Sequence, residues 1–197
     1  MTEPLNLGFD FDGVIGDTHG LMQEVASYFL GVDRPISHFA SKAAVLANFS
    51  NEAAWFLYRT SHESHHWGVD RLKPIKNSLC YLRLLEQDGH NLSIITKRHS
   101  EVSVYAARTW LKRQGSNIKI YNVPRGETKV AWARHLRLDF FVDDELGNLI
   151  DLDPYVPNKV HFKTKHVLDH GLACIPMIDN WESLYLAMAT LPWPRIS

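Results

Sequence analysis

Apolar runs and helical patterns alternate along most of the chain. Short apolar runs predict strands at 7–9, 91–96, 118–123, 139–142, 160–162 and 173–178. Between them, apolar residues three and four positions apart predict helices at 74–89, 100–114, 127–136 and 181–189. Strands that alternate with helices are typical of a parallel sheet with right-handed crossovers. We therefore predict an α/β fold with a Rossmann-like core of three layers, α/β/α, around a parallel sheet.

The segment between the first two predicted strands breaks this alternation, because residues 17–73 show only helical patterns. Ser37 predicts a short helix that runs to Leu46, and Ser50 is a typical N-cap for the next one. A connection of this length is too long for a plain crossover between neighbouring strands. We expect a small helical cap at 17–73, inserted into a core formed by 1–16 and 74–197.

Composition and charge narrow the possible partners. The 197 residues are 45% hydrophobic and 22% charged, which suits one α/β domain with a small appendage. The net charge of -1 and the scattered Lys and Arg residues give no broad field for nucleic acid or membranes. Cys80 and Cys174 lie in apolar segments without metal or disulfide spacing, which predicts reduced core residues. With no leader pattern, we expect a cytoplasmic monomer or homodimer without a membrane partner.

A pair of carboxylates follows the first predicted strand. Asp10 and Asp12 stand two residues apart at its end, directly before Gly13. Asp is depleted in strands, and ligands of open α/β sheets bind at the carboxyl ends of the strands. One carboxylate of such a pair can attack phosphorus or hold a metal ion while the other moves a proton. The structural alternative is a strand end that is capped by Asp in a glycine turn.

Three further polar features follow other predicted elements of the same sheet. Thr96 ends the second strand, Lys129 begins a helix, and Asp143 and Asp144 follow a later strand. Each has an ordinary explanation, as a helix cap, a solvated lysine or an exposed turn. Together they supply a hydroxyl and a cation for phosphate oxygens and carboxylates for a hard cation. We therefore expect one site for a phosphate group at this edge of the sheet.

These residues resemble the haloacid dehalogenase superfamily of phosphotransferases. Asp10-Phe11-Asp12-Gly13-Val14 is similar to its first motif, and Thr96 after Ile94-Ile95 to its second. Lys129 is similar to the third motif, and Asp143-Asp144 after Phe140-Phe141-Val142 to the fourth. The predicted cap resembles the one that many members insert after the first motif. Within the superfamily, the closing stretch Ile178-Asp179-Asn180-Trp181-Glu182 resembles the deoxyribonucleotidase-type members.

The resemblance implies a phosphatase that hydrolyses a small phosphomonoester, a nucleotide or another metabolite phosphate. Asp10 would be the nucleophile that forms an aspartyl-phosphate, and Asp12 the acid and base. The implied cofactor is Mg²⁺, held by Asp10, the Asp12 carbonyl, Asp144, and Asp143 directly or through water. The implied phosphate-binding groups are Thr96, the backbone amides of Phe11 and Lys97, and Lys129.

Alternative activities remain open within this resemblance. Dehalogenating members lack an acid two positions after the nucleophile, so Asp12 favours phosphoryl transfer. Phosphonate-cleaving members use a cap lysine, and the predicted cap contains only Lys42, with Lys73 at its border. A phosphomutase, a catalytically silent module that binds a phosphorylated ligand and a nucleic-acid 3′-phosphatase also remain. The neutral charge disfavours the last of these.

The predicted cap contains a segment rich in aromatic and imidazole side chains. Trp55, His66 and Trp67 are candidate substrate contacts, as a wall on which a flat group stacks. The alternative is packing between cap and core, and a metal site formed by the cap histidines lacks an acidic or cysteine partner. Arg98 either reaches a substrate anion or starts a surface helix.

Overall fold

The computed structural model describes residues 4–39, 41–98, 100–163 and 175–190, and it contains a parallel sheet of six strands. The strands are β1 (Asn6–Phe9), β2 (Asn91–Thr96), β3 (Lys119–Asn122), β4 (Phe140–Asp143), β5 (Asn158–Phe162) and β6 (Met177–Ile178). Their order is β3-β2-β1-β4-β5-β6, and every neighbouring pair is parallel. This is the strand order of a Rossmann-like fold, in which ligands bind where the order reverses, beside β1.

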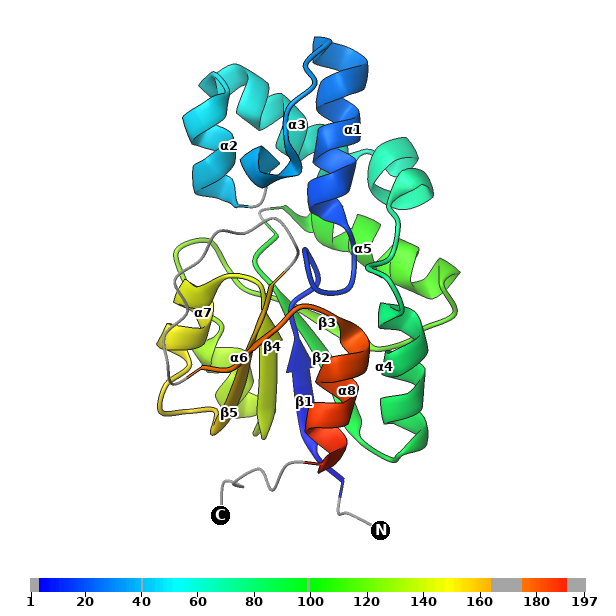
Figure 1. Cartoon of the computed structure of the whole chain (residues 1–197), viewed down its shortest axis with the longest axis vertical. Coiled ribbons are helices and arrows are strands. Elements are labelled where there is room, and N and C mark those ends of the chain that lie inside the picture. The colour runs from blue at the N-terminus through cyan, green and yellow to red at the C-terminus, as the bar shows by residue number, and fades with distance from the viewer. Residues whose placement is uncertain (1–3, 40, 99, 164–174, 191–197) are drawn as a thin grey trace.

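Helices cover both faces of the sheet (Figure 1). One face packs against α4 (Ser78–Gln87), α5 (Glu101–Arg113) and α8 (Trp181–Thr190), and the other against α6 (Val130–His135) and α7 (Leu146–Asp151). Successive strand residues point to opposite faces, so Ile94 joins the first apolar cluster and Ile95 the second. The predicted three-layer α/β/α core is therefore confirmed.

The segment between β1 and α4 is helical, as predicted. It contains α1 (Thr18–Leu30), the 3₁₀ turn η1 (Ile36–Phe39), α2 (Lys42–Asn48), α3 (Asn51–Glu63) and the π-helical segment η2 (His65–Arg71). In Figure 1, α1, α2 and α3 lie beyond the carboxyl ends of the strands. The two chain segments that lead into and out of this group run side by side, because the Asp17 amide donates to the Lys73 carbonyl and the Ile75 amide to Ile15, both at 2.8 Å.

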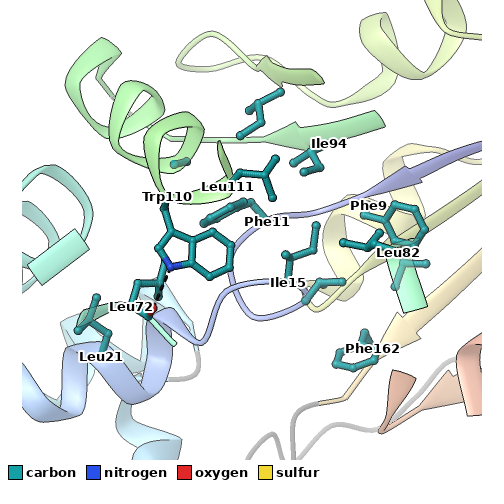
Figure 2. Close-up of a cluster of buried hydrophobic side chains, with 14 of the residues drawn as sticks. Phe9, Phe11, Ile15, Leu21, Leu72, Leu82, Ile94, Trp110, Leu111 and Phe162 are labelled. Atoms are coloured by element: carbon teal, nitrogen blue, oxygen red, sulfur yellow. Dashed lines mark hydrogen bonds between the residues drawn. The ribbon is translucent and has the colours of Figure 1, made fainter. Parts of the chain in front are cut away.

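Two tryptophans fix the loop that follows β1. The Trp110 indole of α5 packs edge-on against Phe11 and donates to the Leu72 carbonyl at 2.8 Å (Figure 2). The Trp181 indole of α8 donates to the Val14 carbonyl, also at 2.8 Å. Both indoles are buried. The loop that carries the first carboxylate pair is thus held from two helices.

Some local predictions are wrong. The helix expected from Ser37 to Leu46 is instead a 3₁₀ turn followed by α2, because the Ser41 hydroxyl caps α2 by accepting from the Ala44 amide at 3.1 Å. Pro74 does not begin α4 but pairs with Gly16 in an isolated bridge.

The cysteine prediction is also wrong where the structure describes it, because Cys80 is exposed rather than buried in the core. The first two residues of the strand expected at 173–178, Cys174 among them, lie outside the described residues, and in the described part of that segment the strand is Met177–Ile178. Among the helices of the described ranges, none combines the length and the apolar character needed to cross a membrane.

Candidate active site

The first carboxylate pair lies at the carboxyl end of β1, next to β4. The Asp10 amide donates to the Val142 carbonyl at 2.8 Å, which continues the pairing of β1 with β4. Gly13 follows with φ at +76°, a conformation that favours glycine. A Cβ at Gly13 would lie 2.1 Å from Asp144 Oδ2. The glycine therefore lets the loop approach the carboxylate at the end of β4.

Lys129 joins the first and fourth motifs. Its ammonium group donates to Asp10 Oδ1 at 2.6 Å and to Asp143 Oδ2 at 2.8 Å. Lys129 stands directly before α6 and is 1% exposed. Burial acts to lower its pKa, but the two carboxylates raise the pKa above its usual value. Lys129 is thus a charged part of the site rather than a solvated helix residue.

Asp143 has hydrogen bonds to both of its carboxylate oxygens. Oδ2 accepts from Lys129, and Oδ1 accepts from the Glu145 amide at 2.9 Å and from Asn148 Nδ2 at 3.1 Å. Asn148 Oδ1 in turn accepts from Lys97 Nζ at 2.6 Å. The Lys97 side chain is therefore bound to α7 through Asn148. Asn148 was missed because α7 is a six-residue helix without a capping side-chain bond and was not predicted.

Three buried carboxylates face one ammonium group in this part of the site. Ligand atoms of Asp10, Asp143 and Asp144 lie within 4.8 Å of one another. Burial, with Asp143 and Asp12 nearby, raises the pKa of Asp10 to about 8 despite Lys129. Burial and the charges of Asp10 and Asp143 raise the pKa of Asp144 well above its ordinary value. An all-oxygen donor set with an excess of negative charge fits a hard divalent cation.

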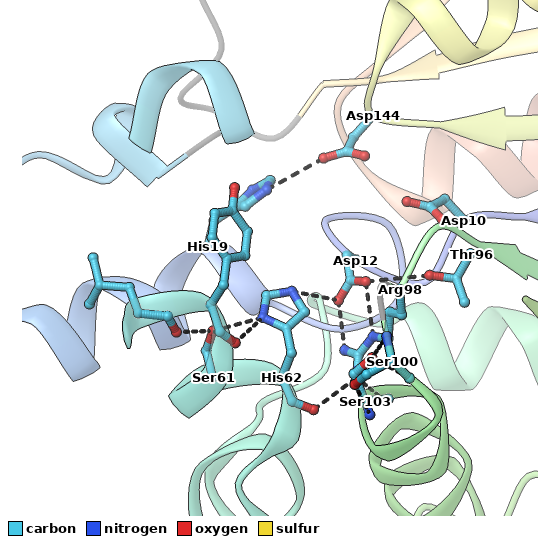
Figure 3. Close-up of polar contacts among 12 residues, drawn as sticks. Asp10, Asp12, His19, Ser61, His62, Thr96, Arg98, Ser100, Ser103 and Asp144 are labelled. Carbon is cyan, nitrogen blue, oxygen red and sulfur yellow. Dashed lines mark hydrogen bonds and ion pairs between the residues drawn. The ribbon is translucent and has the colours of Figure 1, made fainter. Parts of the chain in front are cut away.

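Asp12 is held apart from this cluster by Arg98 (Figure 3). Arg98 Nη2 donates to Asp12 Oδ1 at 2.7 Å and Nε to Oδ2 at 3.1 Å, while the Thr96 hydroxyl lies 3.5 Å from Oδ2. Burial acts to raise the pKa of Asp12, but Arg98 and then His62 hold it well below its usual range. Arg98 is 3% exposed, so it does not start a surface helix.

Two histidines from the inserted helices also reach the carboxylates. His62 Nε2 lies 3.8 Å from Asp12 Oδ1, and its Nδ1 contacts the Ser61 hydroxyl at 2.8 Å and the Tyr58 carbonyl at 3.0 Å. Burial lowers the pKa of His62 to about 4, so the imidazole is neutral at pH 7. His19 Nε2 lies 3.6 Å from Asp144 Oδ2. Asp17 caps α1 by accepting from the Gly20 amide at 2.9 Å, so His19 lies in the first turn of the helix that follows the Asp10–Asp12 loop, which is the sequence signal for its position.

A cavity of about 230 Å³ opens between these carboxylates and the inserted helices. Its lining contains all the predicted catalytic and phosphate-binding residues, Asp10, Asp12, Thr96, Lys97 and Lys129, and the predicted metal ligand Asp144, but not Asp143. The far wall, formed by the inserted helices, is mixed: the apolar or aromatic side chains of Met22, Phe39, Trp55 and Tyr58 lie there together with the charged Lys42, Arg59 and Glu63. The buried hydroxyl of Thr18 also lines the cavity and has no hydrogen-bond partner among the described residues.

The predicted substrate contacts divide between two places. Trp55 and Arg98 line the cavity, whereas His66 and Trp67 lie outside its lining. Trp67 is buried against the rings of Tyr28 and Phe29. His66 is exposed and lies near Asp70. These ring contacts of Trp67 are therefore with another inserted helix, α1, and neither Trp67 nor His66 lines this cavity.

No family model matches the sequence, and no curated protein matches it in sequence. The structure is similar to that of a predicted phosphatase from Clostridium acetobutylicum, with a TM-score of 0.67, 15% identity and coverage of 96% of this chain and 100% of that one. Protein Tyrosine Kinase A from Mycobacterium tuberculosis matches with a TM-score of 0.66 and 15% identity, over 95% of this chain and 99% of that one. The haloacid dehalogenase-like family protein SP0104 from Streptococcus pneumoniae matches with a TM-score of 0.58 and 16% identity, over 83% of this chain and 86% of that one. At these identities the likeness shows the fold alone, and one neighbour is named a phosphatase while another is named a kinase.

Proposed function

We propose that this chain, which has the fold of the haloacid dehalogenase-like hydrolases, is a Mg²⁺-dependent phosphatase. It hydrolyses a small phosphomonoester through an aspartyl-phosphate on Asp10. The observation that carries the proposal is the pair of bonds from Lys129 to Asp10 and Asp143, which join separate segments of the chain in one buried cluster. The cavity beside this cluster gives a phosphate group access to Asp10.

Asp10, Asp144 and the backbone carbonyl of Asp12 would hold the Mg²⁺ ion. Asp143 fits a supporting position, because both of its oxygens accept hydrogen bonds from protein groups. The bound ion would supply a positive charge that screens the repulsion between the Asp10 carboxylate and an anionic substrate. The remaining chemistry belongs to side chains of the chain itself.

In the first step, the ionised Asp10 carboxylate attacks phosphorus and the bond to the alkoxide leaving group breaks; a bound cation would favour this ionised form, because burial otherwise raises the pKa of Asp10 to about 8. Lys129 would orient the nucleophile through Oδ1, and the Thr96 hydroxyl and the Lys97 amide, whose residues line the cavity, would stabilise the equatorial oxygens. Asp12 delivers a proton to the leaving oxygen; because Arg98 holds the pKa of Asp12 well below its usual range, Asp12 must first take up this proton, for which a substrate that enters as the phosphate monoanion is a source. In the second step, Asp12 takes a proton from water, which attacks phosphorus and releases Asp10 and inorganic phosphate.

The far wall of the cavity suits a small leaving group with a flat apolar face. Trp55 and Tyr58 offer aromatic surface for stacking, and the Thr18 hydroxyl offers a hydrogen bond to a substrate hydroxyl. A nucleoside monophosphate is the first expectation and a sugar phosphate or another metabolite phosphate the second. The helices of residues 17–73 act in this proposal as the cap that selects the substrate.

The proposal is tested by measuring inorganic phosphate release from a panel of phosphomonoesters, with Mg²⁺ and with EDTA. We expect turnover with Mg²⁺ only, and a loss of at least about a thousandfold in Asp10→Asn, which removes the nucleophile. Asp33→Asn serves as a matched control on an exposed residue. Binding of a phosphorylated ligand without phosphate release across the panel would identify a silent binding module instead.

A further inference from the structure

Every nitrogen of the Arg98 guanidinium has a protein partner. Two donate to Asp12, as described above, and Nη1 donates to the Ser103 carbonyl at 2.7 Å and faces the His62 carbonyl at 3.5 Å. The guanidinium also lies over the Phe11 ring, 4.7 Å from its centre. Figure 3 shows Arg98 directed at Asp12 from the side away from Asp10 and Asp144. This arrangement directs four of the five N–H donors of Arg98 at protein groups rather than at the cavity.

We propose that Arg98 is a positioning residue that fixes the orientation of the Asp12 carboxylate and does not bind substrate. The inference rests on the proposed function, in which Asp12 moves protons. A bidentate pair between guanidinium and carboxylate fixes the plane of the carboxylate as well as its distance. Asp12 needs such support, because it stands in the loop after β1 and receives no bond from Lys129.

The inserted helix α3 completes the same arrangement. Its last turn places His62 Nε2 3.8 Å from Asp12 Oδ1 and the His62 carbonyl against Arg98. The adjacent Glu63 accepts from the Ser100 hydroxyl at 2.6 Å, which ties the end of α3 to the start of α5. Because Arg98 contacts both Asp12 and α3, the orientation of the proton-transfer residue depends on α3 being docked.

The test compares substrates whose leaving groups differ in their need for a proton. We expect Arg98→Gln to lower kcat about 100-fold on glycerol 3-phosphate, whose alkoxide must be protonated, but less than about fivefold on 4-nitrophenyl phosphate. KM and the inhibition constant of inorganic phosphate should stay within about threefold. Arg108→Gln is the matched control, since Arg108 lies outside the lining of the cavity and donates to the Ile120 carbonyl. Arg98→Lys keeps the positive charge but cannot form the two parallel hydrogen bonds of a guanidinium. It should therefore show the same loss of kcat on glycerol 3-phosphate and little loss on 4-nitrophenyl phosphate.

A double-mutant comparison separates positioning from binding. If Arg98 acts through Asp12, Arg98→Gln adds no further loss in an Asp12→Asn background. Equal losses on both substrates, a tenfold weaker inhibition by phosphate, or additive losses would overturn the proposal. Absence of turnover in the wild type would refute the proposed function but would not by itself refute the positioning role of Arg98. In that case the crystal structure of Arg98→Gln or Arg98→Lys decides, and an unchanged Asp12 orientation refutes the positioning role.

Discussion

The metal-free protein should become more stable when Asp10 loses its charge. The pKa of Asp10 is about 8 in the folded state, against 3.8 for the ordinary carboxyl group. Between these pH values the folded state holds a proton that the unfolded state has released, so stability falls as pH rises from about 4 to about 8. A difference of about four pKa units, at about 1.4 kcal/mol per unit, corresponds to roughly 6 kcal/mol.

Asp10→Asn removes this ionisation while Lys129 keeps its bond to Asp143. Asp10, Asp143 and Asp144 interact and titrate together, so the effect cannot be assigned to Asp10 alone. We therefore expect the free energy of unfolding of the variant at pH 8 to exceed that of the wild type by about 3 kcal/mol, half of the roughly 6 kcal/mol. At pH 4.5 only about 0.7 pH units above the ordinary pKa of 3.8 have been crossed, so little free energy has accumulated and the gain should be below about 1 kcal/mol.

Urea unfolding in EDTA at both pH values measures this difference. Asp33→Asn, on an exposed residue, should show no comparable gain at either pH. A variant that is equally stable as the wild type at pH 8, or that gains the same amount at both pH values, would refute the reasoning from carboxylate repulsion. Loss of activity with a gain in stability is the trade expected at a site whose charges serve catalysis.

Three further predictions concern the metal, the cavity wall and the glycine turn. Mg²⁺ at about 100 times its dissociation constant should raise the free energy of unfolding of the wild type by about 2.7 kcal/mol. Asp144→Asn should lose most of this gain in urea titrations, and an unchanged gain would place the ion elsewhere. Trp55→Ala should raise KM for a nucleoside monophosphate about threefold to tenfold, because stacking on the indole is lost. The control Phe56→Ala, at a neighbour outside this cavity, should leave KM unchanged, and equal KM values for the two variants would contradict the stacking role. Gly13→Ala should abolish both turnover and Mg²⁺ stabilisation, because the new Cβ would lie 2.1 Å from Asp144 Oδ2, and wild-type values of both would contradict this.

The core of the fold could be predicted because its pattern is regular. The apolar runs of β1, β2 and β4 are short, but they recur between periodic helices, and this alternation shows their type. The same regularity placed Asp10, Thr96 and Asp144 at one edge, since parallel strands bring their carboxyl ends together. Their meeting in one cavity needed no information beyond the alternation of strands and helices.

The short and irregular elements could not be predicted in this way. The segments η1, η2 and α7 each span four to seven residues, too few for the apolar period to be distinguished from chance. Pro74 fits the first turn of a helix by its fixed φ, but its segment is instead held beside Gly16 by backbone bonds. Tertiary contacts decided these positions.

The partner of Arg98 was also beyond the sequence. Nothing in the spacing of Asp12 and Arg98 indicates that their side chains meet, because the contact depends on how the loop after β1 faces the loop after β2. The same is true of His62, whose approach to Asp12 requires the docking of α3. Sequence patterns predict which end of the sheet a residue occupies, whereas side-chain partners within that end depend on packing.

The distribution of the two buried cations has a consequence for substrate binding. Lys129 is bonded to Asp10 and Asp143, and Arg98 is bonded to Asp12, so each positive charge already faces carboxylates of the site. Asp144 adds a further buried carboxyl group with a raised pKa. In the proposed reaction Asp10 must be ionised, so a phosphate dianion beside it would meet a like charge at close range, and burying like charges together is costly. We therefore expect a divalent cation held by Asp10 and Asp144 to raise the affinity for substrate, alongside the positive charges of Lys42, Arg59 and Lys97 in the cavity lining.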